Sequence, residues 1–211
     1  RASRGDTVKC IGDMLPQAAK DGAFTAVREA LRRLDEIAND PGLTDVVTAA
    51  RATLADPAVL ADVCRAPETD ADAAIAGEIL HAAGPLGAEA LLDSYTRGST
   101  TTRSPLRPVL RGMSETVLGA ARSRLRGADP KTARAIVSTL PALGDKRAIP
   151  LIADVLETSL DESVRFAAAS ALASIPVPEA AQALIRAINH REPETQRYVV
   201  RELGQIGRAH V

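Results

Sequence analysis

One leucine recurs along the chain at an almost constant spacing, and this spacing constrains the fold more than any other feature of the sequence. The leucines are Leu80, Leu110, Leu140, Leu172 and Leu203, so the successive steps are 30, 30, 32 and 31 residues. Each lies in an apolar segment that closes on a turn signal, usually Gly or Pro. A period of this size is typical of repeat proteins, in which every repeat is one supersecondary unit.

A second apolar segment follows the turn in each repeat. Residues 149–156 in one repeat correspond to residues 181–188 in the next, and residues 90–92 fill the same place earlier. A helix–turn–helix hairpin of this kind cannot bury its apolar side alone, but hairpins stacked in sequence form a continuous core. The sequence therefore predicts an all-α fold. The expected units are residues 70–98, 101–127, 129–159, 161–190 and 192–211, the last of them incomplete.

Composition agrees with stacked helices and says little about partners. Aromatic residues make up 2% of the chain and Trp is absent, so the core must consist mainly of Ala, Leu, Ile and Val. Ala and Leu are among the strongest helix formers. The formal net charge is −1. Residues 1–105 carry 11 Lys/Arg and 16 Asp/Glu, whereas residues 106–211 carry 15 and 11, so the second half is the basic one.

Local signals predict where helices begin and end. Ser104-Pro105, Asp129-Pro130 and Glu192-Pro193 each place an oxygen-bearing side chain before a Pro, which favours a helix start, and Asp161 opens another unit without Pro. Glycines follow the first helix of four units, where a left-handed cap is expected. These glycines are Gly84, Gly112, Gly144 and Gly207.

The first third has the same composition with a looser pattern. Helices are predicted at residues 6–19, 23–38, 43–55 and 57–65. We expect residues 1–68 to form a diverged helical region that caps the repeats of residues 69–211, because terminal repeats need a different outer face. Since the chain starts at Arg1 and stops where another helix should begin, we expect a fragment of a longer protein.

The expected compartment is the cytoplasm. No apolar run approaches the ~18 residues of a membrane span, and no signal peptide is visible. The two cysteines, Cys10 and Cys64, both lie in apolar helical patterns, which predicts two reduced, buried thiols rather than a disulfide.

Several segments resemble HEAT repeats, in particular the short bacterial repeats also found in phycobilisome-lyase-like proteins. Residues 165–175, RFAAASALASI, resemble the first-helix pattern RxxAxxALxxI, and residues 144–152, GDKRAIPLI, resemble the following turn and second helix. The resemblance is best over residues 129–211 and departs from the usual Gly-Asp turn at Ser114 and Pro176. It implies a right-handed α–α superhelix, a solenoid of stacked hairpins, and in most members a scaffold for protein partners.

Enzymes of the HEAT-like class impose requirements that this chain does not meet. Di-iron hydroxylases of the class use His-Glu pairs, but Ala, Arg and Val follow His81, His190 and His210. DNA glycosylases need aromatic side chains around a lesion, and Phe166 and Tyr198 fit core packing better. Glycine-rich phosphate loops are also absent. We therefore expect no enzyme activity, cofactor or metal site, and we keep a lyase or glycosylase as the last alternative.

A cluster of cations spans the middle of the chain. Nine Lys/Arg residues lie between Arg97 and Arg134, opposed only by Glu115 and Asp129. Spacings of four place some of them on shared helix faces. The candidate binding residues of this basic ridge are Arg103, Arg107, Arg111, Arg122 and Arg126. The ridge is either a solvated face with local ion pairs or a site for an acidic segment, a phosphate or a nucleic acid.

The second helices supply another candidate surface, since in HEAT-like solenoids they line the concave side. Its polar residues are Asp154, Glu157, Arg186 and His190. The favoured hypothesis is a non-enzymatic scaffold that presents a helical surface to a partner protein or to another domain of its own chain. An anion or nucleic-acid binder that uses the Arg103–Arg134 ridge is the alternative, because phosphate contacts alone give salt-sensitive, unspecific binding.

Overall fold

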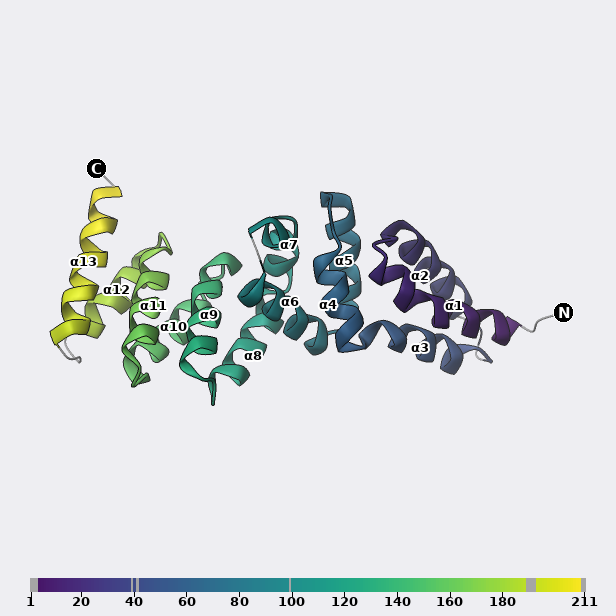
Figure 1. The fold of residues 1–211 in the computed structure, drawn as a ribbon, viewed down its shortest axis with the longest axis horizontal. Helices are drawn as coiled ribbons and strands as arrows, with labels where there is room; N and C mark the ends of the chain where they lie inside the picture. The colour runs from purple at the N-terminus through teal and green to yellow at the C-terminus, as the bar shows by residue number, and fades with distance from the viewer. Residues whose placement is uncertain (1–3, 39, 41, 99, 189–192, 210–211) are drawn as a thin grey trace. The chain divides into compact units, whose positions relative to one another are not determined.

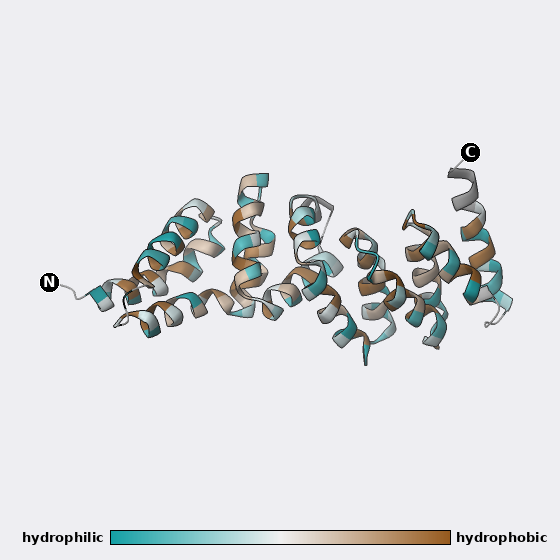
Figure 2. Ribbon diagram, turned by 180° about the vertical axis from the view of Figure 1, so that it is seen from behind, coloured by the Kyte–Doolittle hydropathy of each residue, from teal (hydrophilic) through white to brown (hydrophobic). Residues whose placement is uncertain are grey.

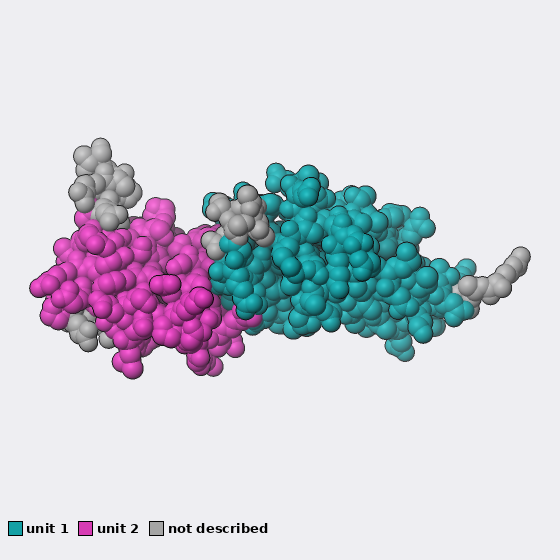
Figure 3. All heavy atoms as spheres, viewed as in Figure 1, with its two compact units in different colours: residues 1–116 teal, residues 117–211 magenta. Residues whose placement is uncertain are grey.

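The apolar segments of the sequence form helices joined by short turns (Figure 1). The computed structural model describes residues 4–38, 40, 42–98, 100–188 and 193–209, and within these ranges it leaves out the side chains of residues 100–103, 188 and 205–209. No strand occurs among the described residues. The chain forms two compact units, residues 1–116 and 117–211, which Figure 3 distinguishes by colour. The predicted division near residue 68 stays a prediction.

The first unit contains seven complete helices in the part of the chain described, and one short 3-10 turn. They are α1 (Arg4–Lys20), α2 (Phe24–Ala38), α3 (Thr44–Ala52), η1 (Thr53–Ala55), α4 (Pro57–Arg65), α5 (Asp70–Ala82), α6 (Pro85–Arg97) and α7 (Thr100–Gly112). Helix α1 packs against α2, α3 and α4. It approaches α3 closely at Gly12, where a Cβ would lie 2.8 Å from the Cα of Ala50. The four helices predicted before residue 66 all form.

The second unit starts inside α8 (Ser114–Leu125) and continues as two-helix layers. The later elements are α9 (Pro130–Thr139), η2 (Leu140–Leu143), α10 (Ala148–Thr158), α11 (Glu162–Ala173), α12 (Pro178–Ile188) and α13 (Pro193–Ala209). The first helices α9, α11 and α13 pack side by side in chain order, and the second helices α10 and α12 pack behind them (Figure 1). Helix α11 also packs against α10, which joins successive layers.

The recurring leucines form the centre of this packing. Leu80, Leu110, Leu140 and Leu172 are all 0% exposed, while Leu203 is half-buried. Apolar residues gather on the inner sides of the helices, as the brown segments of Figure 2 show. The repeat register predicted from the leucine spacing is therefore the register of the structure.

Two aspartates cap helices of the second unit as predicted. Asp129 accepts hydrogen bonds from the backbone N–H groups of Lys131 and Thr132, and Asp161 accepts one from Val164. Gly144 adopts the predicted left-handed conformation, with φ of 65°. The glycine cap saves the strain that a side chain would cause there.

Three predicted helix ends are wrong. Helix α7 begins at Thr100, so Ser104-Pro105 does not start it and both Pro105 and Pro108 lie inside the helix. Gly112 is the last residue of α7 and has no positive φ. Helix α13 runs through Gly207 to Ala209. At α7 the burial of Leu106 and Leu110 favours a helix that the local Pro signals oppose.

The two capping carboxyls predict how stability depends on pH. Hydrogen bonds, above all from the Thr132 hydroxyl, lower the pKa of Asp129, and those from the Ser163 hydroxyl and the Val164 N–H lower the pKa of Asp161. Folding therefore favours the ionised carboxyls. Their contribution is complete above the unfolded pKa of about 3.9 and is lost as the pH falls through the folded pKa values.

Replacing both aspartates with serine should make the fall in Tm between about pH 5 and pH 3 shallower, because Ser still caps a helix but carries no charge. Thermal unfolding followed by circular dichroism at stepped pH measures this, with Asp154→Ser as the control for loss of one exposed carboxylate. An unchanged pH profile in the double variant would contradict the role of the two caps.

Candidate functional site

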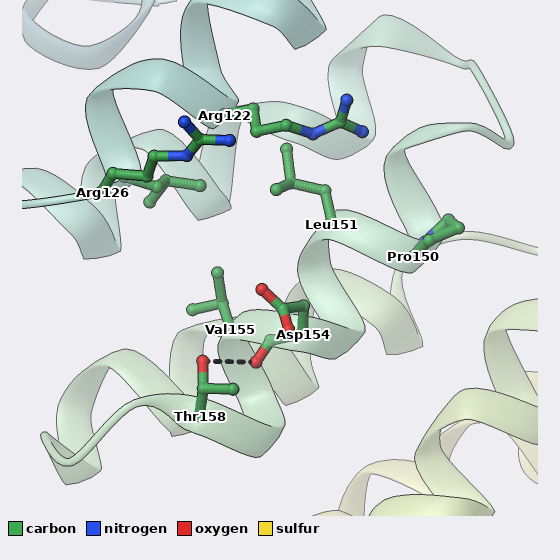
Figure 4. A pocket seen from close by; sticks show the side chains of 8 residues that line it. Arg122, Arg126, Pro150, Leu151, Asp154, Val155 and Thr158 are labelled. Carbon is green, nitrogen blue, oxygen red and sulfur yellow. Dashed lines mark hydrogen bonds between the residues drawn. The ribbon is translucent and has the colours of Figure 1, made fainter.

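A groove opens between helices α8 and α10 of the second unit (Figure 4). Its volume is about 460 Å³. The lining residues are Arg122, Leu125, Arg126, Pro150, Leu151, Asp154, Val155 and Thr158. The two walls come from the second helices of successive hairpins, because α8 ends one repeat and α10 ends the next.

The floor of the groove is apolar. Leu151 is 7% exposed, and Leu125 and Val155 are half-buried. Helix α10 turns one face into the hairpin stack, where Ile152 and Leu156 are fully buried. One turn spacing along α10 then brings Leu151 and Val155 to the edge of that face, where they meet α8. The groove therefore offers apolar surface that the chain itself covers only in part.

The rim of the groove is charged and asymmetric. Arg122 in the last turn of α8 and Arg126 in the turn that directly follows are both exposed, and the carboxylate of Asp154 lies across from them on α10 (Figure 4). Within the described part of the chain, neither arginine forms an ion pair. Other cations of the same unit do form them, as the Lys146–Glu179 pair at 3.0 Å shows. The two guanidinium groups thus remain available to a ligand.

The remaining residues of the predicted ridge do not all join this groove. Arg107 and Arg111 are exposed on α7, which belongs to the first unit, and the side chain of Arg103 lies outside the described part of the structure. Arg134 lies on the first helix α9 and lines a different hollow. Of the ridge residues whose side chains the structure describes, Arg122 and Arg126 line the groove, and Asp154 from the second predicted surface lines it with them.

Two other predicted second-helix residues, Glu157 and Arg186, do not line the groove. Glu157 is half-buried on α10, and Arg186 is exposed on α12. His190 falls outside the described residues. Among the predicted second-helix residues that the structure describes, Asp154 is the one that lines the groove with Arg122 and Arg126.

A second hollow, of about 450 Å³, lies on the first helices α9, α11 and α13. At one end the rings of Phe166 and Tyr198 stack with centroids 4.2 Å apart and planes 7° apart, and the guanidinium of Arg201 lies 4.4 Å from the Tyr198 ring centre. Both rings are half-buried, so the prediction that they belong to the core holds only in part. They tie α11 to α13 through ring stacking and a cation–π contact.

Arg165 is a buried arginine whose role the sequence did not reveal. It is 5% exposed and lies in α11, inside the segment that resembles a HEAT first helix. Its Nε donates to the hydroxyl of Thr195 on α13 at 3.0 Å, and one terminal nitrogen donates to the carbonyl oxygens of Ser159 and Leu160 at 3.2 and 2.9 Å. The side chain therefore joins α11, the preceding turn and α13.

The cysteines differ in environment. Cys64 is buried, and burial raises the pKa of its thiol to about 12, so almost none of it is thiolate at neutral pH. Cys10 is exposed, so the prediction that both thiols are buried is wrong for this residue. Cys10 lies on the outer side of α1, away from the face that buries Val8, Gly12, Leu15 and Ala19.

The described residues show neither a metal-ligand cluster nor a membrane-spanning helix. No group of three or more His, Cys, Asp and Glu side chains there is placed to hold a metal ion. Among the helices described, none combines the length and the apolar character that a bilayer crossing requires.

Stacked helical hairpins with a groove between second helices define an α-solenoid, a helical-repeat protein. Residues 118–203 match the family model described as HEAT repeats, so this segment consists of HEAT repeats. The match covers α9 to α12 completely, together with most of α8 and much of α13. No curated protein matches the chain.

A solved structure that resembles the chain aligns over nearly its whole length. It is the structure of human deoxyhypusine hydroxylase in complex with glycerol, with 14% sequence identity and a TM-score of 0.41. The alignment covers 96% of this chain and 98% of the other.

Proposed function

We propose that this chain is a non-enzymatic scaffold that holds a segment of a partner, from another protein or from another domain of its own chain, in the α8–α10 groove. The observation that carries the proposal is the combination of a partly open apolar floor with two exposed arginines that have no ion pair in the described structure. HEAT repeats, which residues 118–203 form, commonly mediate protein interactions.

The size and chemistry of the groove favour a short segment. A volume of about 460 Å³ accommodates a few side chains of a partner. Covering the floor around Leu151 and Val155 would contribute roughly 25 cal/mol for each Å² of apolar surface removed from water. The charged rim would add orientation and a faster encounter with a partner of matching charge.

The test uses peptides selected against the intact chain. A display library of short random peptides is panned on the purified protein, and the recovered peptides are measured by fluorescence anisotropy. Thr158→Trp places a bulky side chain at the exposed end of the groove, so we expect recovered peptides to bind that variant at least about tenfold more weakly.

Glu162→Trp is the matched control, because Glu162 is exposed on α11, lines neither hollow and receives the same bulky side chain. It should leave the affinity unchanged. Circular dichroism of each variant verifies the fold. The proposal fails if no peptide is enriched, or if enriched peptides bind the two Trp variants equally well.

A further inference from the structure

We infer that the partner segment recognised by the α8–α10 groove is an acidic extended peptide, with two carboxylates about 6–7 Å apart and an apolar side chain beside them. This inference rests on the proposed function, since it names the chemistry of the segment that the groove would hold.

The cationic wall sets the spacing of the ligand's charges. Arg122 lies in the last turn of α8 and Arg126 directly follows the helix, four residues on, so their Cβ atoms lie about one helical turn, roughly 6 Å, apart. Carboxylates at positions i and i+2 of an extended peptide lie about 6–7 Å apart, since each residue advances about 3.3 Å. Each guanidinium could then hold one carboxylate through paired N–H···O bonds, a geometry that suits arginine.

The floor requires an apolar group in the same ligand. Leu125 and Val155 are only half-buried, so water contacts them in the free chain. A purely ionic ligand would leave this surface in water and gain nothing from it. An acidic peptide with a Leu, Val or Met side chain would cover the floor while its carboxylates reach the rim.

The opposite wall distinguishes a peptide from a polyanion. The Asp154 carboxylate faces the groove from α10 (Figure 4), where it repels a phosphate chain that fills the groove. Peptide backbone N–H groups instead suit this wall, because a carboxylate is a strong hydrogen-bond acceptor. The Asp154 side chain is free for this role, since the bond from the Thr158 hydroxyl, at 2.7 Å, goes to the Asp154 backbone oxygen.

The experiment extends the peptide selection with charge-matched variants. The probe is the tightest groove-dependent peptide recovered, labelled with fluorescein, together with a copy in which every Asp and Glu is replaced by Asn and Gln. The double variant Arg122→Gln/Arg126→Gln removes the cationic wall. Lys131→Gln/Arg134→Gln is the control, because it removes two exposed cations from α9 and lies outside this groove.

The inference predicts that the recovered peptides are enriched in Asp and Glu next to an aliphatic residue. Their affinity should fall at least about tenfold in the groove double variant and less than about twofold in the control. The amide copy of the peptide should bind the unmodified chain as weakly as the acidic peptide binds the groove variant. Affinity should also decrease as salt is raised from about 50 to 300 mM.

The outcomes distinguish failure of the acidic-partner inference from failure of the scaffold proposal. If the recovered peptides are neutral or basic but Thr158→Trp still excludes them, the scaffold proposal stands and the acidic partner is overturned. If labelled oligothymidylate binds as tightly as the peptide and loses affinity in the same double variant, the groove is a polyanion site and the inference is overturned. Recovery of no groove-dependent peptide overturns both proposals.

Discussion

Replacing Leu140 or Leu172 with Ala should lower the free energy of unfolding by roughly 2–5 kcal/mol at each site. Both side chains are 0% exposed and occupy the same place in successive repeats. Shortening either one removes apolar contacts and leaves a cavity that the neighbouring helices fill only in part. Urea unfolding followed by the far-ultraviolet circular dichroism signal measures the change.

The chain offers a closely matched control in Leu160, which is 95% exposed in the turn before α11. Leu160→Ala makes the same chemical change without opening a cavity, so it should alter stability by no more than about 0.5 kcal/mol. If the two buried substitutions cost no more than the exposed one, the leucines do not mark the core of the repeats.

Replacing Arg165 with Ala should cost several kcal/mol in the free energy of unfolding, because each buried hydrogen-bonding group left without its partner costs about 1–3 kcal/mol. The change leaves the carbonyls of Ser159 and Leu160 without this donor and breaks the bond to the hydroxyl of Thr195, which is itself 0% exposed. Hydrogen exchange should show faster exchange in α13 than in α10, because the lost bond to Thr195 is the one that reaches α13.

Two further substitutions show whether geometry or charge matters at this position. Arg165→Lys keeps the charge but presents a single ammonium group in place of the planar fork, so it should recover only part of the lost stability. Arg197→Ala removes an exposed arginine paired with Glu194 at 3.0 Å and should have little effect. Equal stability of the Lys variant and the unmodified chain would show that the fork geometry is unimportant.

Most of the fold follows from the sequence because apolar spacing and helix caps act locally. The steps between Leu80, Leu110, Leu140 and Leu172 set the hairpins, and Asp129 and Asp161 start helices where the sequence indicates. Where prediction failed, tertiary packing outweighed a local signal. At α7 the burial of Leu106 and Leu110 extends a helix past two prolines, a balance that no short window of sequence contains.

The groove was less accessible to prediction. The spacing of four predicts that Arg122 and Arg126 share a helix face, and the pattern places Asp154 on a second helix. The sequence alone assigns them to two separate candidate surfaces. Their meeting depends on the register between α8 and α10, which the packing of whole hairpins decides. The buried role of Arg165 could not be predicted for a related reason. Its partner Ser159 precedes its helix, and its partner Thr195 lies in the next hairpin.

The two walls of the groove belong to successive hairpins, which has a mechanical consequence. In a solenoid each layer contacts only its neighbours, so the angle between two successive layers depends on the one interface between them. A segment bound between α8 and α10 would contact both hairpins and so restrict the angle between them. Conversely, a force that separates α8 from α10 would widen the groove and release the segment, so binding of the segment and bending at this interface would be coupled.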